Sequence, residues 1–120
     1  MSDDLLVRIE NHVAIITLNR PDSYNSINTA LLEEIPGVLR DVADNTDVGC
    51  LVITGAGKAF CSGGDINDQV SAADGISKSS EGRMDDLRRA LEGARLLHEM
   101  PKPTIAMING VAAGAGMTMA

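Results

Sequence analysis

Aromatic residues are almost absent from this sequence, which has one Tyr, one Phe and no Trp among 120 residues. A single-domain core in a chain of this length must therefore be built from Leu, Ile, Val, Ala and Met. Cysteine is scarce too. Cys50 and Cys61 lie in apolar surroundings, with no CxxC motif and no Cys/His cluster. This argues against a disulfide framework or a metal site and favours two small buried thiols in a reducing compartment.

Positive charge and long apolar runs are also lacking. The chain has 10 Lys and Arg against 17 Asp and Glu, a net charge of -7, which argues against nonspecific binding to nucleic acid or to an anionic membrane. No apolar run approaches the length of a membrane span, and the N-terminal MSDDLLVRIE lacks the pattern of a signal peptide. We therefore expect a cytoplasmic globular protein.

Strand-like apolar runs alternate with amphipathic segments along the chain. Runs at 5–9 and 13–18 flank a short turn and predict an antiparallel hairpin. The later segments predict a helix from 28 or 29 to 44, a strand at 50–54, a helix at 84–99 and a strand at 104–108. Pro36-Gly37 predicts a kink or a break in the first helix, because Pro36 has no N–H to donate. This order of elements indicates an α/β fold.

Two glycine-rich turns follow the two strands that we expect to be buried. SGGD at 62–65 follows the strand at 50–54, and GAG at 114–116, where a new helix is expected to begin, follows the strand at 104–108. Either turn alone is explained as well by a tight bend. Glycine also lets a ligand approach the backbone, and two such turns brought together would direct two N–H donors at one oxygen atom. That arrangement is an oxyanion hole. Between the turns, the polar segment at 67–83 is predicted to be a mobile loop or a lid.

Three stretches carry a resemblance to a known family. They are VAIITLNRPDSYNSIN at 13–28, VITGAGKAFCSGGDI at 52–66 and KPTIAMINGVAAGAGM at 102–117. In this order and at these intervals, the sequence resembles the crotonase superfamily, whose best-known members are enoyl-CoA hydratases and isomerases. The resemblance implies a fold of repeated ββα units that form a superhelix. Residues 1–120 would be the N-terminal part of a single crotonase-like domain.

The resemblance also implies a substrate and a site. An acyl-CoA thioester would place its carbonyl oxygen between the N–H groups of Gly64 and Ala115 while an enolate-like intermediate forms. Coenzyme A would be part of the substrate, with no separate cofactor, and a homotrimer or hexamer is expected. Further contacts to the substrate are expected from Arg20, Tyr24, Ser62, Gly63, Asp65, Ile66 and Gly114. Four basic residues are candidate phosphate partners, although for each of them we favour the interpretation of a solvated surface charge: Arg20, Lys58, Arg83 and Lys102.

Several other polar side chains have a structural interpretation that we favour over a catalytic one. Asp65 could serve as an acid or base, but a carboxylate in a turn more often accepts local N–H bonds. Cys61 and Ser62 have no base in a suitable pattern, so neither is favoured as a nucleophile. His12, in a predicted turn, and His98, near a helix end, are interpreted as surface residues. The methionines at 107, 117 and 119 are expected in the core or in an acyl pocket.

Thr118 is a departure from the hydratase pattern. Hydration of an α,β-double bond uses two carboxylates, and the first of them would fall at residue 118, where threonine cannot act as a carboxylate base. In hydratases of the family the second lies later than residue 120. The alternatives therefore include double-bond isomerisation, dehalogenation, C–C cleavage and ring isomerisation. A noncatalytic acyl-CoA-binding paralogue is an alternative of a different class.

We expect the 120 residues, if produced alone, to show little or no turnover, because half of the family's core and its acid/base would be missing. The rate of turnover of crotonyl-CoA by the purified 120-residue chain checks this expectation. A normal rate would contradict it.

Overall fold

The computed structural model describes residues 3–64 and 80–120, and within 80–90 the side chain of Arg88 alone. The predicted loop or lid at 67–83 therefore falls mostly outside the described residues. The elements are β1 (Leu5–Glu10), β2 (Val13–Leu18), the 3-10 helix η1 (Pro21–Ser23), α1 (Thr29–Asp44), β3 (Cys50–Gly55), β4 (Ala59–Cys61), α3 (Ser80–Glu99), β5 (Thr104–Met107), β6 (Val111–Ala112) and α4 (Ala115–Met119). In the part of the chain described, no helix is long and apolar enough to cross a membrane.

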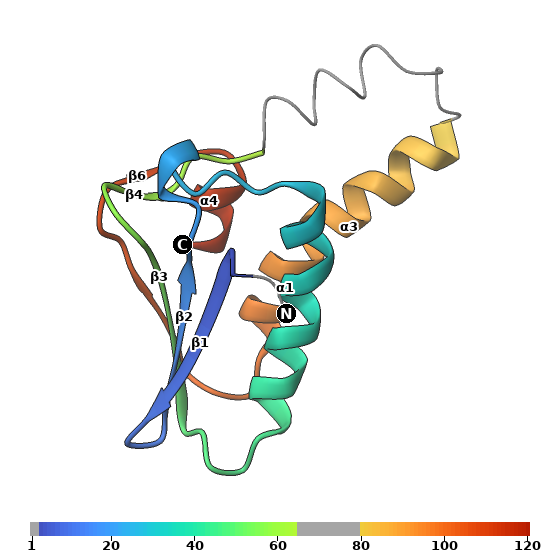
Figure 1. Ribbon diagram of the computed structural model, residues 1–120. Coiled ribbons are helices and arrows are strands. Elements are labelled where there is room, and N and C mark those ends of the chain that lie inside the picture. The colour runs from blue at the N-terminus through green and yellow to red at the C-terminus, as the bar shows by residue number, and fades with distance from the viewer. Residues whose placement is uncertain (1–2, 65–79) are drawn as a thin grey trace.

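The main sheet has the strand order β1-β2-β3-β5 (Figure 1). β1 and β2 form the predicted antiparallel hairpin, with Glu10 opposite Val13. Asn11 and His12 in its turn have φ of 50° and 67°, the positive values that a type I′ turn requires. β2, β3 and β5 run parallel to one another, so α1 and α3 lie in the two crossover connections.

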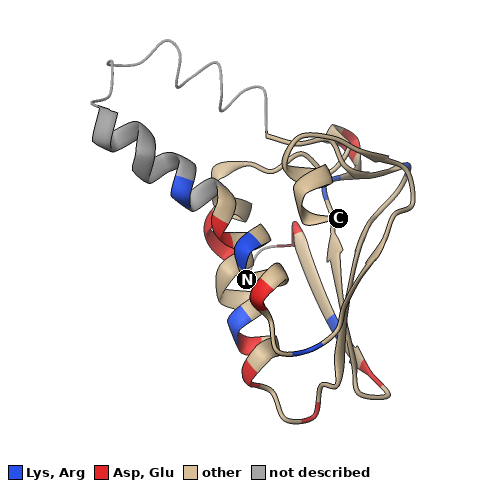
Figure 2. Cartoon of the chain, turned by 180° about the vertical axis from the view of Figure 1, so that it is seen from behind, with Lys and Arg blue, Asp and Glu red and all other residues tan. Residues whose placement is uncertain are grey.

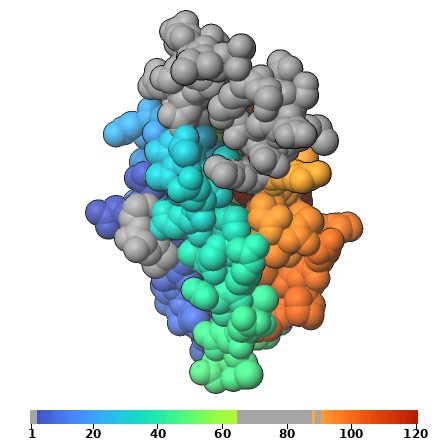
Figure 3. Space-filling view, turned by 90° about the vertical axis from the view of Figure 1, so that its right-hand side faces the viewer, coloured from blue at the N-terminus to red at the C-terminus, as the bar shows by residue number. Residues whose placement is uncertain are grey.

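The core lies between this sheet and the helices α1 and α3, which pack side by side over one of its faces (Figures 1 and 3). Alternate residues of β2 and β3 point into the core, as expected for strands covered on one face. The side chains that meet there include Ala14, Ile16, Leu18, Leu51 and Ile53 from the sheet, and Leu31, Ile35, Leu39, Val42 and Leu97 from the helices. Phe60, the one phenylalanine, is fully buried beside them. The core is therefore aliphatic, as the composition requires.

Helix α1 runs through Pro36 without interruption, so the alternative of a break there is wrong. Asn28 caps the helix by accepting a hydrogen bond of 2.9 Å from the Leu31 N–H. Pro36 cannot donate to the Leu32 carbonyl, but it is itself buried and lies on the apolar face that packs against the core. Burial of that face offsets the missing hydrogen bond.

Helix α3 begins at Ser80, earlier than the predicted start at 84. Charged residues gather on α1 and α3 (Figure 2), and Arg40 of α1 joins Glu92 of α3 by an ion pair of 2.8 Å. A hydrogen bond from Arg95 lowers the pKa of Glu92 below its ordinary value. Because such exposed pairs contribute little to stability, the contact between the two helices depends mainly on their apolar side chains.

Strand β5 is not buried, contrary to the prediction for 104–108. Ile105 and Met107 are 52% and 54% exposed, while Ala106 between them packs against the core. β5 pairs with β3 at the edge of the described sheet, and no described element covers the side chains on its other face. A continuous apolar run has the same sequence pattern whether one or both faces of the strand are covered.

Strands β4 and β6 form a second, small parallel sheet that the sequence did not predict. Ala59 pairs with Val111 and Cys61 with Ala112. The two strands have three and two residues, too few for any periodicity to be recognised. Each leads directly into one of the two glycine-rich turns, so this pairing sets the position of one turn relative to the other.

Lys102, which lies outside helix α1, caps the C-terminal end of that helix. Its ammonium group donates to the carbonyls of Val42 at 2.8 Å and Asn45 at 2.5 Å. Carbonyls in a last turn have no partner within their own helix, and a cation there also interacts favourably with the helix dipole. Lys102, a candidate phosphate partner in the sequence, is thus engaged inside the chain.

We predict that Lys102→Met lowers the free energy of unfolding by about 1–2 kcal/mol, because two carbonyls lose a charged donor. Urea denaturation followed by circular dichroism measures the change. Lys58→Met is the matched control, since Lys58 is exposed on the loop between β3 and β4. Equal losses in the two variants would contradict the prediction.

Candidate functional site

The two glycine turns lie against each other. The Ala113 N–H donates to the Cys61 carbonyl at 3.0 Å, which extends the pairing of β4 and β6 into the turns. Gly63 has a φ of 109°, and a Cβ placed there would lie 3.2 Å from the Ala113 oxygen. A Cβ on Gly114 would lie 3.6 Å from the Cα of Gly63. Glycine at 63 is therefore favoured both by its backbone angle and by the closeness of the other turn.

The N–H groups of Gly64 and Ala115 have no hydrogen-bond acceptor among residues 3–64 and 80–120. Gly64 is exposed, and its neighbour Gly63 is held by a hydrogen bond of 2.7 Å from the Ile27 N–H to the Gly63 carbonyl. Ala115 is half-buried at the first position of α4, where a helix has no internal acceptor for its N–H. Two unused donors thus lie on two turns that touch.

Helix α4 packs closely on the strand that leads to the first turn. A Cβ placed on Gly116 would come within 2.7 Å of the Cys61 Cβ and would clash with the Cys61 carbonyl. The side chain of Met119 is buried at the other end of the helix. Any side chain at residue 116 would push α4, and with it Ala115, away from the first turn.

An apolar cavity of about 160 Å³ adjoins Ala115. It lies between α1, α3 and α4, and its wall includes no ionisable side chain among the residues described. The lining consists of Ile27, Leu32, Ile35, Leu91, Gly93, Ala94, Ala115, Thr118 and Met119. Of the three methionines expected in a core or a pocket, Met119 lines this cavity, whereas Met107 and Met117 are 54% and 71% exposed.

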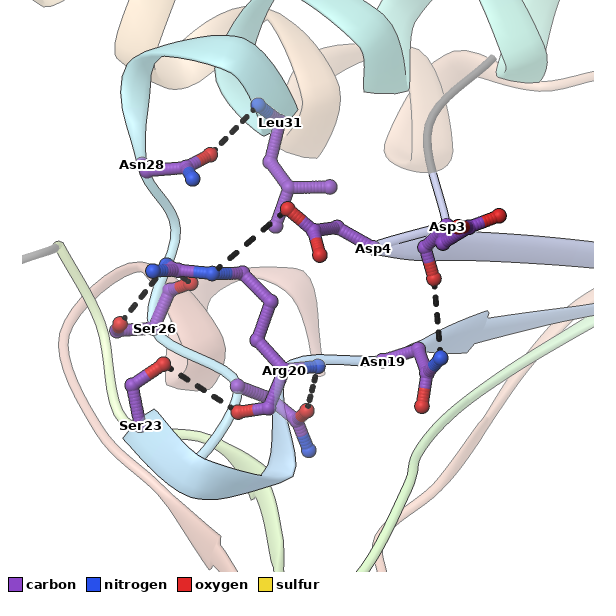
Figure 4. A network of polar contacts seen from close by, with 9 residues as sticks. Asp3, Asp4, Asn19, Arg20, Ser23, Ser26, Asn28 and Leu31 are labelled. Atoms are coloured by element: carbon purple, nitrogen blue, oxygen red, sulfur yellow. Dashed lines mark hydrogen bonds and ion pairs between the residues drawn. The ribbon is translucent and has the colours of Figure 1, made fainter.

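Arg20 is the centre of a polar network that shapes the loop before α1 (Figure 4). Its guanidinium group donates to the Ser26 carbonyl at 2.6 Å and to the Ser26 hydroxyl at 3.1 Å, and it lies 3.9 Å from the Asp4 carboxylate. Ser23 donates back to the Arg20 carbonyl at 3.4 Å. The Arg20 side chain, a candidate phosphate partner in the sequence, is therefore bound within the chain.

The same loop is joined to the first glycine turn. The Ser62 N–H donates to the Tyr24 carbonyl at 3.0 Å, and the Ser62 hydroxyl donates to the Ser23 carbonyl at 3.4 Å. The Tyr24 side chain is 60% exposed beside this contact. The structure thus brings together the predicted residues at 20, 24, 62, 63, 64, 114 and 115, while Asp65 and Ile66 lie outside the described residues.

Thr118 uses its hydroxyl within α4, where it donates to the Gly114 carbonyl at 3.2 Å. The imidazole Nδ1 of His12 donates to the Asp47 carbonyl at 2.9 Å, and His98 lies in the last turn of α3. No three His, Cys, Asp or Glu side chains gather as they would around a metal ion in the described parts of the chain.

Two asparagines at this site were not singled out in the sequence. Asn25 is fully buried, and Asn109 lies in the connection between β5 and β6. Both donate to backbone carbonyls in the loop between β3 and β4 and to the carbonyl of Ala59, the first residue of β4. Asparagine is common in turns for purely local reasons, so the sequence carried no signal of these long-range contacts.

The family model for enoyl-CoA hydratase/isomerase matches residues 8–120. The chain is 37% identical to 1,2-epoxyphenylacetyl-CoA isomerase of Escherichia coli, across all of this chain and 45% of that protein. It is 36% identical to 2,3-dehydroadipyl-CoA hydratase of the same organism, over 98% of this chain and 43% of the other. The crystal structure of an enoyl-CoA hydratase/isomerase from Xanthobacter autotrophicus superposes with a TM-score of 0.90 at 28% identity, covering 99% of this chain and 43% of that one.

Fold, paired glycine turns and sequence similarity together define the class: this chain belongs to the enoyl-CoA hydratase/isomerase family, within the crotonase superfamily. The predicted crotonase-like α/β fold is confirmed. The chain spans a little under half the length of the curated relatives it matches, with 45% and 43% of the two named above.

We predict that Cys61 is chemically inert in the folded protein. Its side chain is fully buried, and burial raises the pKa of the thiol above its ordinary value, an effect that a hydrogen bond from the Gly63 backbone only partly offsets. Little reactive thiolate is then present at neutral or mildly alkaline pH. Alkylation of the native protein followed by peptide mass spectrometry should label the half-buried Cys50 and leave Cys61 unmodified until the protein unfolds. Faster labelling of Cys61 than of Cys50 would contradict this.

Proposed function

We propose that this chain is part of an enzyme that acts on an acyl-CoA thioester, with the N–H groups of Gly64 and Ala115 as the oxyanion hole. The observation that carries the proposal is the pair of N–H groups on two touching turns for which the described part of the chain holds no acceptor. Negative charge that develops on the thioester oxygen as an enolate forms would be stabilised by both donors. Loss of one such donor typically costs on the order of 3 kcal/mol of transition-state stabilisation.

We propose that the apolar cavity beside Ala115 holds the acyl chain. A thioester whose carbonyl lies at the two turns would direct its acyl group into the space bounded by Ile27, Leu91 and Met119, among others. That wall would exclude water and accept a hydrocarbon chain. Among the described residues its lining is apolar except for Thr118, whose hydroxyl is bound to the Gly114 carbonyl, so the cavity would favour apolar acyl groups and offers no ionisable side chain for the reaction.

The coenzyme A part would lie over the exposed side of the same turns. We propose contacts from Tyr24, Ser62, Gly63 and Gly114, together with Asp65 and Ile66. Tyr24 offers an exposed aromatic ring beside Ser62, while Arg20 contributes by holding the shape of the loop that presents Tyr24. Coenzyme A then belongs to the substrate and no separate cofactor is needed. We propose a cytoplasmic homotrimer or hexamer for the complete protein, by analogy with the family.

Thr118 keeps the type of reaction open. Its hydroxyl is bound to the Gly114 carbonyl, and it stands where a hydratase would have its first glutamate. The two bacterial relatives, an isomerase and a hydratase by name, are 37% and 36% identical to this chain, so identity does not choose between them. Double-bond isomerisation, another reaction of an acyl-CoA enolate, and binding without catalysis remain the alternatives. A panel of acyl-CoA thioesters analysed by mass spectrometry separates gain of water, rearrangement at constant mass and no reaction.

We predict that Ala115→Pro in the complete protein lowers kcat about 100-fold and changes the Kd for the acyl-CoA less than about threefold, because it removes one donor to the transition state. Proline is well tolerated at the first position of a helix, and the N–H it removes has no partner within α4. Gly114 precedes it with φ 54° and ψ -124°, the mirror image of the extended backbone that proline requires before it, and glycine adopts it freely.

Thr29→Pro is the matched control, since it places proline at the first position of α1 after an extended Asn28 with ψ 175°. It should leave kcat close to the wild-type value. Gly64→Pro removes the other donor and should also lower turnover far more than affinity. Equal losses of turnover and of affinity in Ala115→Pro and Gly64→Pro would mean that the turns only bind the substrate.

A further inference from the structure

Two asparagine side chains from distant parts of the sequence meet on one backbone carbonyl, that of Ala59. Asn25 donates to it from the loop before α1 at 2.8 Å, and Asn109 donates to it from the connection between β5 and β6 at 3.1 Å. A carbonyl oxygen has two lone pairs, so both bonds can form at once. Ala59 is the first residue of β4, the strand that leads to Gly64.

The side chain of Asn25 is buried, and all of its hydrogen-bonding positions are used. It is 0% exposed, and its backbone has a φ of 56°. Its amide also donates to the Ala56 carbonyl at 2.9 Å, while its oxygen accepts the Arg20 N–H at 2.8 Å. Burial of an amide is costly unless it is hydrogen-bonded, and here both donor positions and the oxygen are used.

Asn109 holds the same loop from the other side. Its amide donates to the Gly57 carbonyl at 3.0 Å as well as to Ala59, and its oxygen accepts the Gly55 N–H at 3.2 Å. The loop at 55–59 is thus fixed by one amide from each side. Unlike Asn25, Asn109 is exposed, so its substitution does not disturb the core.

Each asparagine is close in sequence to a segment that contacts or leads into one of the two glycine turns. Asn25 lies just before Ile27, whose N–H holds the Gly63 carbonyl. Asn109 precedes β6, which pairs with β4 and ends at the turn before Ala115. The shared bond to Ala59 therefore joins the three segments whose relative position decides where the two N–H groups point.

We propose that Asn25 and Asn109 are positioning residues, which fix the Ala59 carbonyl and through β4 and β6 set the Gly64 and Ala115 N–H groups at the spacing that a thioester oxygen needs. This inference rests on the oxyanion hole proposed above. A displacement of about 1 Å at such a site can cost about 100-fold in rate, so a clamp on the loop before β4 has a direct effect on the reaction. Neither asparagine touches the substrate.

Asn109→Asp tests the inference sharply. The substitution keeps the size of the side chain and the oxygen that accepts the Gly55 N–H, but it turns the donor to Gly57 and Ala59 into an acceptor that repels both carbonyls. The readout is the carbonyl stretching frequency of butyryl-CoA labelled with ¹³C at the thioester carbon, measured by infrared difference spectroscopy on the complete protein at saturation. Oxyanion-hole donors lower that frequency, because they polarise the C=O bond.

We expect a shift to lower frequency on the wild-type protein, and in Asn109→Asp a shift reduced to about half or less, with a Kd that rises less than about threefold. Asn109→Ala, which removes the amide without adding charge, should act in the same direction. Asn45→Asp is the matched control: it makes the same change of charge in the loop after α1, keeps the oxygen that accepts the Asp47 N–H, and should leave the shift unchanged.

The role of Asn109 would be overturned if an Asn109 variant with a native circular dichroism spectrum lowered the carbonyl stretching frequency as much as the wild-type protein does. In that case the oxyanion hole itself would still be supported by the wild-type spectrum. Absence of the shift, or of butyryl-CoA binding, in the wild-type protein would instead overturn the proposed function and this inference with it.

Discussion

The parallel pairing of β4 with β6 is the constraint on which the rest of the site depends. It brings together two stretches about fifty residues apart in the sequence and leaves no room between the turns that follow them. Gly116 has no room for a side chain beside Cys61, a Cβ on Gly63 would lie only 3.2 Å from the Ala113 oxygen, and Gly63 and Gly114 have positive φ of 109° and 54°. The glycines at this site are therefore explained by backbone angles and by the closeness of two segments of backbone, and not by any need for flexibility.

Much of the fold could be predicted because its signals are local. The two strands of the hairpin and the span of α1 are defined by neighbouring residues, and both were predicted with nearly correct bounds. The errors arose where contacts between distant segments determine the local structure or its burial. Burial of its apolar face keeps α1 continuous through Pro36, and the exposure of Ile105 depends on what covers β5, which an apolar run does not specify. β4 and β6 exist only because they pair with each other.

The site was predictable only in its backbone part. Glycine has few alternatives where chains approach closely, so the turns at 62–65 and 114–116 stood out in the sequence. The roles of the side chains at the site were harder to predict. Arg20 has the charge of a phosphate partner, yet the structure engages it with Ser26 and Asp4. Asn25 and Asn109 reach carbonyls thirty to fifty residues away, and no local pattern distinguishes them from ordinary turn residues.

Backbone N–H donors alone do not determine which reaction an acyl-CoA undergoes. An N–H group is the same in every residue but proline, so the sequence at 64 and 115 constrains where a carbonyl can lie and says nothing of what happens to it. Acid or base chemistry needs an ionisable side chain near the bound acyl group. Among the described residues the cavity beside Ala115 is lined by apolar groups and by Thr118, whose hydroxyl is occupied by the Gly114 carbonyl. Under the proposed function, the turns after β4 and β6 would hold the thioester, and the side chains around its acyl group would determine the reaction.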